Sequence, residues 1–239
     1  MDADQLTAQA LTGITRLQTD PHDPVGRGLL GEAVARLTEH DACPDWVGDA
    51  ASTLLHPRMP EPVRTERLLL RPLRRDDLED LLDLLGRDEV TEHLLFDSLS
   101  REAVRARIDR ELDPPPGPLR ATVLAAELDG RVVGEFSLHH QPPLFSHVEL
   151  GWVLHPDVQG RGLATEAGRA LLEVAFEHHG AHRVVAHLDA RNTASAMLCE
   201  RLGMRLEQQA VQDWWSKGAW TSSLGYAILR EEWAARPGM

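Results

Sequence analysis

The sequence predicts an α/β fold: a mixed central β-sheet flanked by helices, with an all-helical appendage at the N-terminus. Three observations lead to this prediction. Residues 1–60 show only the spacing of apolar side chains that is typical of helices. Further along, two apolar runs flank Asp129-Gly130, a pair that favours a two-residue hairpin turn. The later strand-like runs alternate with helical segments, which is the pattern of an α/β sandwich.

The N-terminal appendage is predicted as three short helices. Apolar side chains share one helical face in each of three segments, residues 6–17, 30–37 and 47–54. Prolines break the pattern between these segments, at 21–24 and at Cys43-Pro44. Each helix is too short to be stable alone, so its apolar face must pack against the rest of the chain or against a partner subunit.

A linker separates this appendage from the rest of the chain. Pro57, Pro60 and Pro62 lie close together, and proline is not tolerated inside a helix. We therefore expect a helical appendage at 1–58 and a second domain at 63–233. The appendage carries four arginines against nine acidic side chains, so it is not expected to bind DNA. We expect it instead to shape one side of a substrate cleft in the second domain, the side that takes the acceptor, or to make a dimer contact.

The second domain is predicted to begin with a strand and two helices and to continue as a sheet. Its order of elements is β-α-α-β-β-β-α-β-α-β-β, which implies helices packed around a mixed sheet. Asp76 or Asp77 caps the first helix, the second begins near Ser100, and Gly203 ends the last one. The expected strands are 67–72, 121–128, 132–139, 147–154, 184–188, 204–213 and 220–229, and the helices after the meander are 163–179 and 193–202.

Composition and charge exclude several classes of function. No apolar run reaches the roughly 18 residues that a membrane-spanning helix needs, and the acidic N-terminus lacks the features of a signal peptide. The two cysteines, Cys43 and Cys199, have no metal-type spacing, so neither a zinc site nor a disulfide scaffold is expected. The net charge of −13 disfavours nucleic acid and suits a cationic substrate. We expect a cytoplasmic protein that uses no metal and binds neither nucleic acid nor a membrane.

The most informative segment is the loop within 158–167, which joins a strand to a helix. It contains Gly160 and Gly162, and glycine lets the backbone approach an anion closely and adopt a positive φ. The first turn of the following helix has unpaired N–H groups and a partial positive charge, so it attracts phosphate. Ala164 is small enough not to obstruct that approach. The alternative is a plain strand-to-helix turn in which the glycines serve only the geometry.

Gln159, Gly162 and Ala164 fill the pattern Gln-x-x-Gly-x-Ala of acyl-CoA-binding loops. With this loop, the chain resembles the GNAT superfamily of N-acetyltransferases, and within it the branch of the ribosomal-protein N-acetyltransferases RimJ and RimL. Further segments carry the resemblance in order, and residues 1–60 lie outside it. These segments are 65–71 with Asp76-Asp77, 149–156, 192–195 continuing to 200–204, and 226–233, which resembles the closing strand of the branch.

The resemblance implies the GNAT fold and acetyl-CoA, or another acyl-CoA, as the acyl-donor substrate. The backbone of Trp152, Val153 and Leu154 would pair with the pantetheine amides in the manner of a strand. Asn192 would hydrogen-bond the pantetheine arm where the two central strands separate. An ordinary helix N-cap is the alternative role for Asn192, since Ser195 follows three residues later. The residues implied to hold the pyrophosphate are Gln159, Gly160, Arg161, Gly162, Leu163, Ala164 and Thr165.

Transfer of an acyl group to an amine needs a proton acceptor, because a lysine-like amine has a pKa of about 10.4 and an α-amine one of about 8. Glu149 shares a strand face with Gly151 and Val153, just before the stretch implied to pair with the acyl donor. Many GNAT enzymes keep a glutamate base or a water-relaying carboxylate there. We therefore predict Glu149 as the catalytic base, with a salt-bridged or solvated surface side chain as its alternative role. The next candidate is His147, followed by His139, His140 and Glu135.

The proton donor to the leaving thiolate is predicted as Ser195. Many GNAT proteins place a tyrosine acid in the last helix, but this sequence has Cys199 there, and its only tyrosine, Tyr226, lies in the final strand. The RimL-like alternative is a serine one helical turn earlier, which Ser195 fits; its other role would be that of a capping-turn serine. Cys199 is expected to be a small buried side chain rather than a nucleophile. A backbone N–H near Val153 is expected to stabilise the oxyanion.

The resemblance thus implies an N-acyltransferase that moves an acetyl group from acetyl-CoA directly to a primary amine. Both a protein N-terminus and a small cationic amine fit as the acceptor, and relatives also use longer or acidic acyl groups. The alternative function is a non-catalytic acyl-CoA-binding sensor or scaffold with the GNAT fold. Trp214, Trp215 and Trp220 could shape an acceptor pocket, pack in the core or form the contact of a homodimer.

Overall fold

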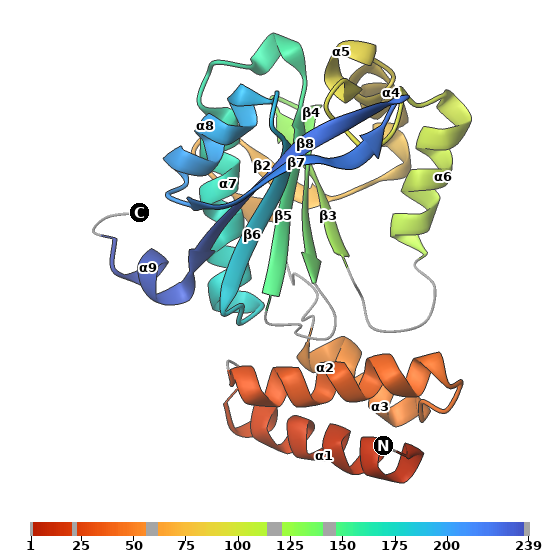
Figure 1. Cartoon of the computed structure of the whole chain (residues 1–239). Coiled ribbons are helices and arrows are strands. Elements are labelled where there is room, and N and C mark those ends of the chain that lie inside the picture. Colours follow the sequence, from red (N-terminus) through yellow and green to blue (C-terminus); the bar gives the residue numbers. More distant parts are fainter. Residues whose placement is uncertain (1, 21–22, 56–61, 114–120, 141–146, 237–239) are drawn as a thin grey trace.

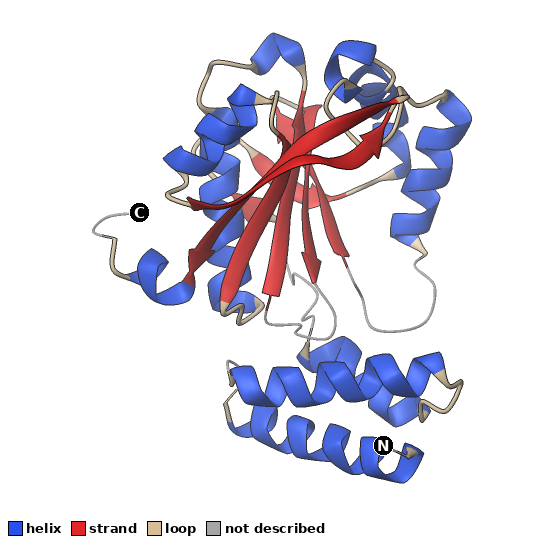
Figure 2. Ribbon diagram, viewed as in Figure 1, coloured by secondary structure: helices blue, strands red, loops and turns tan. Residues whose placement is uncertain are grey.

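The computed structural model describes residues 2–20, 23–55, 62–113, 121–140 and 147–236. These residues form a bundle of three helices and an α/β unit (Figures 1 and 2). The predicted fold class is confirmed, because one mixed sheet is flanked by helices and further helices precede it. Most of the predicted linker, at 56–61, lies outside the described residues, so the boundary between 1–58 and 63–233 stays a prediction. In the described ranges, no helix has both the length and the hydrophobicity to cross a bilayer.

The N-terminal bundle consists of α1 (Ala3–Thr19), α2 (Pro24–Glu39) and α3 (Asp45–Leu54). Asp2 caps α1 by accepting a hydrogen bond from the Gln5 N–H, and Asp23 caps α2 in a similar way. The first two helices pack closely because Gly13 has no side chain: a Cβ there would lie 2.7 Å from the Leu30 backbone nitrogen. The apolar faces predicted from the sequence form a separate core, which includes Leu6, Leu17, Leu30, Leu37 and Val47.

In the described part of the chain, the sheet contains eight strands in the order β1-β2-β3-β4-β5-β6-β8-β7. Neighbouring strands are antiparallel except for the central pair, β5 and β6, which is parallel. The pairing of β5 with β6 runs from His147↔Arg183 to Glu149↔Val185 and stops there, so the two strands diverge beyond Glu149. The strands are β1 (Val63–Arg64), β2 (Leu69–Pro72), β3 (Ala121–Leu128), β4 (Arg131–His140), β5 (His147–Leu154), β6 (Arg183–Asp189), β7 (Arg205–Ser216) and β8 (Ala219–Leu229).

Helices cover both faces of the sheet (Figures 1 and 2). On one face, Leu84 and Val104 from the helices join one apolar cluster with Val123 of β3. On the other face, Leu171 and Leu198 join the main core with Leu150 of β5. The first group of helices is α4 (Leu78–Leu85), α5 (Asp88–Thr91) and α6 (Arg101–Leu112), the second is α7 (Leu163–Glu173) and α8 (Thr193–Arg201), and α9 (Arg230–Ala234) follows the last strand. Single 3-10 turns at Arg75–Asp77 and Pro156–Val158 precede α4 and α7.

The ends of several predicted elements move by one to three residues, and two segments differ more from the prediction. The helix expected over 163–179 is α-helical only to Glu173 and continues as a π-helical turn, Val174–His178. The last strand, expected over 220–229, is found as β8 and ends at Leu229. The Glu232 carboxylate accepts a hydrogen bond from the Leu229 N–H at 2.8 Å and starts α9, so only residues 226–229 of the segment 226–233 that resembles the closing strand are in the strand.

The helical bundle lies against the end of the sheet where β5 and β6 begin (Figure 1). Arg27 of α2 is 1% exposed and donates to the Leu55 carbonyl at 3.0 Å. Burial lowers the pKa of Arg27 to about 10, and the nearby Arg230 guanidinium contributes. Burial also lowers the pKa of His179 to about 3, with smaller contributions from His140 and Arg27. Because the charge of Arg27 interacts with Arg230 and with His179, α2 lies next to this end of the α/β unit.

Candidate active site

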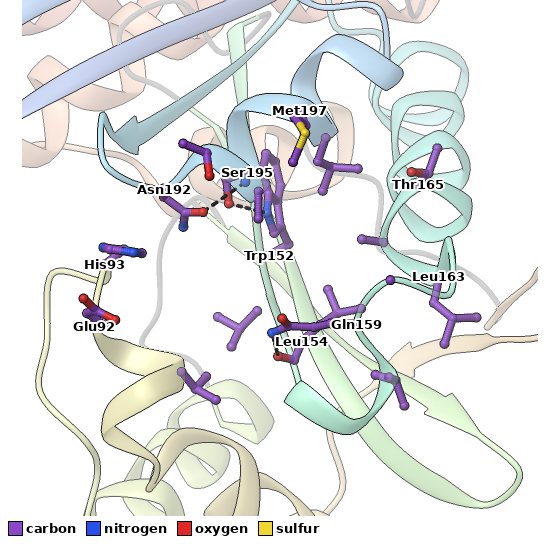
Figure 3. Close-up of a pocket in the computed structure, with 18 of the residues that line it drawn as sticks. Glu92, His93, Trp152, Leu154, Gln159, Leu163, Thr165, Asn192, Ser195 and Met197 are labelled. Carbon is purple, nitrogen blue, oxygen red and sulfur yellow. Dashed lines mark hydrogen bonds between the residues drawn. The ribbon is translucent and has the colours of Figure 1, made fainter.

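A cavity of about 670 Å³ opens where β5 and β6 diverge (Figure 3). The end of β5, the loop that leads into α7, the start of α8 and the segment around α5 surround it. Two predicted site residues, Glu149 and Arg161, do not belong to its lining. The predicted residues that line it are Trp152, Val153, Leu154, Gln159, Gly160, Gly162, Leu163, Ala164, Thr165, Asn192 and Ser195.

The glycine loop brings an uncapped helix end to this cavity. Gly160 and Gly162 have φ values of 72° and 79°, in the left-handed region that favours glycine. Gly162 is the N-cap of α7, and as a glycine it has no side chain to cap the first N–H groups of this helix. The first residues of the helix, from Leu163 to Thr165, line the cavity. The unpaired N–H groups and the positive end of the helix dipole at this point suit an anionic group.

The turn between β1 and β2 braces this loop from outside the cavity. The Arg67 guanidinium donates to Glu166 Oε2 and to the Arg161 carbonyl, at 2.7 and 2.9 Å. The Arg67 main-chain N–H also donates to Glu166 Oε1 at 2.7 Å, and Thr65 Oγ1 donates to the same oxygen at 2.5 Å. Partial burial would raise the pKa of Glu166, but these hydrogen bonds outweigh it and lower that pKa. The sequence signalled residues 65–67 only through the family resemblance, not as part of the loop.

Three polar groups meet at the start of α8. Asn192 Oδ1 accepts a hydrogen bond from the Ser195 N–H at 3.0 Å, so Asn192 caps the helix. The Trp152 indole N–H donates to Ser195 Oγ at 3.2 Å (Figure 3). The capping role of Asn192 is therefore confirmed. Because Asn192 also lines the cavity, its position is compatible with a second role in binding the acyl donor.

Glu149 lies on the sheet just before β5 and β6 diverge, where it pairs with Val185. Its Oε1 is 3.2 Å from Nδ1 of His187, which stands two residues further along β6. This hydrogen bond raises the pKa of His187, against a smaller opposing effect of burial. Sequence reasoning did not single out His187, because nothing in its neighbourhood along the chain indicates the carboxylate that faces it.

The other candidate bases each have a different environment. Burial lowers the pKa of His147 and of His139, and His139 Nε2 is 3.0 Å from Ser137 Oγ. His140 is buried against His179 at 3.2 Å, at the end of the sheet nearest the bundle. Glu135 forms an ion pair with Arg107. None of these four predicted alternatives belongs to the cavity lining.

One side of the cavity is formed by an acidic segment that sequence reasoning missed. Glu89 and Glu92 line the cavity together with His93, whose ring lies beside Asn192 (Figure 3). The Arg191 guanidinium, which also lines the cavity, pairs with Asp189 at 2.6 Å. This segment follows the first helix predicted for the second domain, and no pattern along the chain indicates that it lies at the cavity. The packing of α4 and α5 brings it there.

The remaining candidates of the sequence analysis lie outside the cavity lining. Cys199 is fully buried, and burial raises its pKa to about 12, as expected for a structural thiol. Tyr226 is buried in the main core. Trp214, Trp215 and Trp220 are about half exposed, so they neither pack in the core nor shape the cavity. In the residues described, no cluster of side chains could hold a metal ion.

The sequence model of the acetyltransferase (GNAT) domain matches residues 67–205. The chain belongs to the GNAT acetyltransferase family. The uncharacterized N-acetyltransferase YnaD of Bacillus subtilis is 36% identical over 85 residues, which are 36% of this chain and half of YnaD. YdaF of the same organism, named as a candidate ribosomal N-acetyltransferase, is 26% identical over 172 residues, which are 70% of this chain and 94% of YdaF. A crystal structure of a GNAT-family acetyltransferase from Bacillus anthracis has a TM-score of 0.65 at 26% identity, covering 72% of this chain and 99% of that one.

Two more distant crystal structures share the fold at 18% identity and a TM-score of 0.62. One is spermidine N-acetyltransferase from Vibrio cholerae in complex with CoA and spermine, which covers 70% of this chain and 98% of its own. The other is the ribosomal L7/L12 alpha-N-protein acetyltransferase RimL in complex with CoA. The match covers 71% of this chain and 98% of RimL. The predicted resemblance to the GNAT superfamily and to its RimJ and RimL branch is confirmed.

Proposed function

We propose that this protein transfers an acetyl group from acetyl-CoA directly to the nitrogen of a primary amine. One observation carries the proposal: a glycine loop at a helix N-terminus and the gap between two diverging strands meet in a single cavity. The loop suits a pyrophosphate, and the gap suits an extended chain that continues the pairing of β5. Membership of the GNAT family supports the same reaction.

In this proposal the acyl donor lies along the cavity, with its pyrophosphate at the N–H groups from Arg161 to Thr165. The stretch from Trp152 to Leu154 pairs with the pantetheine amides, because β6 no longer occupies that edge of β5. Asn192 uses its Oδ1 to cap α8, so its amide N–H groups remain available to donate to a pantetheine carbonyl. Gln159, which donates to the Leu154 carbonyl at 3.4 Å, links the strand to the loop.

The chemistry follows from the groups around the point of divergence. The amine nitrogen attacks the thioester carbon, and a backbone N–H near Val153, on the edge of β5 that β6 leaves free, stabilises the oxyanion that forms. The Glu149 carboxylate takes the amine proton, through a water molecule because Glu149 stands behind the cavity lining. Ser195, on the lining, gives a proton to the leaving thiolate. Holding the amine beside the thioester supplies much of the acceleration.

The acceptor is proposed to be cationic, either a small amine or a protein N-terminus. Glu89 and Glu92 line the cavity, and Arg191, which also lines it, is paired with Asp189. The chain as a whole carries a net charge of −13, which attracts cations. A positive charge on the acceptor would therefore be favoured at the α5 side of the cavity.

An assay of CoA release from acetyl-CoA against a panel of amines tests the proposed function. The panel contains a polyamine, an aminoglycoside, free amino acids and a peptide with a free N-terminus. We expect release that depends on the amine, together with an N-acetylated product detected by mass spectrometry. Tight binding of acetyl-CoA without amine-dependent release would contradict transfer and favour a non-catalytic acyl-CoA sensor.

A further inference from the structure

The side chain of Trp152 connects the end of β5 to the start of α8. Its indole Nε1 donates a hydrogen bond to Ser195 Oγ at 3.2 Å, across 43 residues of sequence (Figure 3). The indole ring packs against the main core, and close packing keeps such a ring in one orientation. Both side chains line the cavity. The contact therefore lies at the site of the proposed reaction and has a defined direction.

This hydrogen bond limits what the Ser195 hydroxyl can do. An indole N–H can only donate, so Oγ accepts it with a lone pair. The Ser195 main-chain N–H is already bonded to Asn192 Oδ1 at 3.0 Å. Among the described residues, the Ser195 hydroxyl has no acceptor for its own hydrogen. Ser195 is thus fixed by two contacts that both leave its O–H available as a donor.

Other groups near α8 are less suited to donate a proton in the cavity. Cys199 is fully buried, and burial raises its pKa to about 12. Tyr226 is 5% exposed within the main core. Thr165 and Thr193 do line the cavity, but in the described residues no hydrogen bond orients either hydroxyl. Ser195 alone among these groups combines access to the cavity with a fixed orientation.

We propose that Trp152 is a positioning residue, whose indole N–H holds the Ser195 hydroxyl as the proton donor to the leaving thiolate. The inference rests on the proposed function. The amine nitrogen bonds to the acetyl carbon, and the carbon–sulfur bond breaks with its electron pair going to sulfur. Ser195 gives its hydroxyl proton to sulfur, while Glu149 takes the amine proton through water. Water then returns that proton from Glu149 to Ser195, so the net change moves one proton from nitrogen to sulfur.

A Trp152→Phe variant tests the role, because it keeps an aromatic ring against the core and removes the indole N–H. We expect kcat to fall about threefold to tenfold, the scale of one hydrogen bond, with CoA affinity and the KM of the amine unchanged. Ser195→Ala should lower kcat further. Adding Trp152→Phe to Ser195→Ala should then have no additional effect, because Trp152 acts through Ser195. Trp215→Phe, the same change at an exposed position outside the cavity, is the control and should leave kcat unaltered.

Losses that multiply in the double variant would overturn the inference, as would a drop in CoA affinity in Trp152→Phe alone. A second measurement needs no turnover. In the ¹H–¹⁵N spectrum of the whole chain, the indole resonance that disappears in Trp152→Phe should shift in Ser195→Ala, and an unshifted resonance would also overturn the inference. Wild-type protein that releases CoA with no amine would instead contradict the proposed function, and the role in transfer would fall with it.

Discussion

At the scale of single residues, Glu149 and His187 form a pair across the point where β5 and β6 diverge. The carboxylate raises the pKa of the imidazole, because its hydrogen bond favours the protonated ring. A general base has to stay ionised and correctly directed while the amine approaches. The hydrogen bond to His187 directs the Glu149 carboxylate, although the His187 side chain is half exposed and solvent therefore weakens the pair.

Replacing Glu149 with Gln should lower the pKa of His187, because the carboxylate that raises it is removed. His187 would then lose its proton at a lower pH in the variant than in the wild-type protein, which an NMR titration of the imidazole measures.

The same variant should reduce kcat/KM by roughly tenfold to a thousandfold, near the range for losing a general base, with CoA affinity barely changed. His147→Gln, at the first pair of the same two strands, is the control. An unaltered kcat/KM in Glu149→Gln together with a loss in His147→Gln would assign the base to His147.

Residues could be predicted from the sequence where one segment carries the signal. Gly162 follows from a local pattern, a glycine loop before a helix, whereas Ser195 follows from the resemblance to RimL. His187, Glu92 and Arg67 could not be predicted as site residues. Each acquires its place from a partner that is distant in sequence, so only the fold brings the two together.

At the scale of elements, the glycine loop is braced by the turn between β1 and β2 as well as by its own residues. Arg67 bonds to the Arg161 carbonyl and to Glu166, the latter in the first turn of α7. The loop conformation places both glycines at positive φ. A flexible loop would lose part of its binding energy when it becomes ordered around an anion. The brace reduces that loss by holding the loop in place beforehand.

Removing this brace with Arg67→Ala should weaken the affinity for CoA by about threefold to tenfold, the scale of one or two hydrogen bonds. The fold should persist, because the Arg67 side chain is partly exposed and lies outside the main core. Isothermal titration calorimetry measures the affinity, with Arg64→Ala on the exposed side of β1 as the matched control. Equal affinities in both variants would show that the loop does not depend on Arg67.

Elements were predictable where the apolar period is regular, and their ends were not. The helices of the bundle and the strands of the meander follow from spacing alone. The π-helical turn at Val174–His178 keeps a helix-like pattern, so the change in hydrogen bonding cannot be seen in the sequence. Likewise Lys217-Gly218 forms the turn between β7 and β8 with φ values of 50° and 80°, although a Lys-Gly pair is not a strong hairpin signal.

At the scale of the whole molecule, the bundle and the cavity lie at opposite ends of the sheet (Figure 1). No described residue of α1, α2 or α3 lines the cavity. The expectation that the appendage shapes the acceptor side is therefore wrong for the chain as described. The bundle has its own core and meets the α/β unit around Arg27. A dimer contact stays a prediction.

Deleting residues 1–58 should leave the affinity for CoA and the KM of the amine unchanged, because the bundle stands away from the cavity. It should expose the surface around His140 and His179, which is buried in the full chain, and so reduce solubility or change the oligomeric state. Light scattering and CoA titration of both proteins measure these effects. A truncated protein that stays soluble with its oligomeric state unchanged would show that the bundle covers no surface of importance.

The central claim is that the loop at 158–165 binds the pyrophosphate of acetyl-CoA, and calorimetric titration of CoA into a Gly162→Glu variant tests it most directly. The new side chain would bring bulk and a negative charge to the N-terminus of α7, where phosphate is expected. Gly130→Glu makes the same change at another positive φ, at a hairpin tip where a Cβ meets nothing within 4 Å. The account predicts that Gly162→Glu abolishes measurable binding while Gly130→Glu binds CoA as the wild-type protein does. Wild-type affinity in a folded Gly162→Glu protein would contradict it.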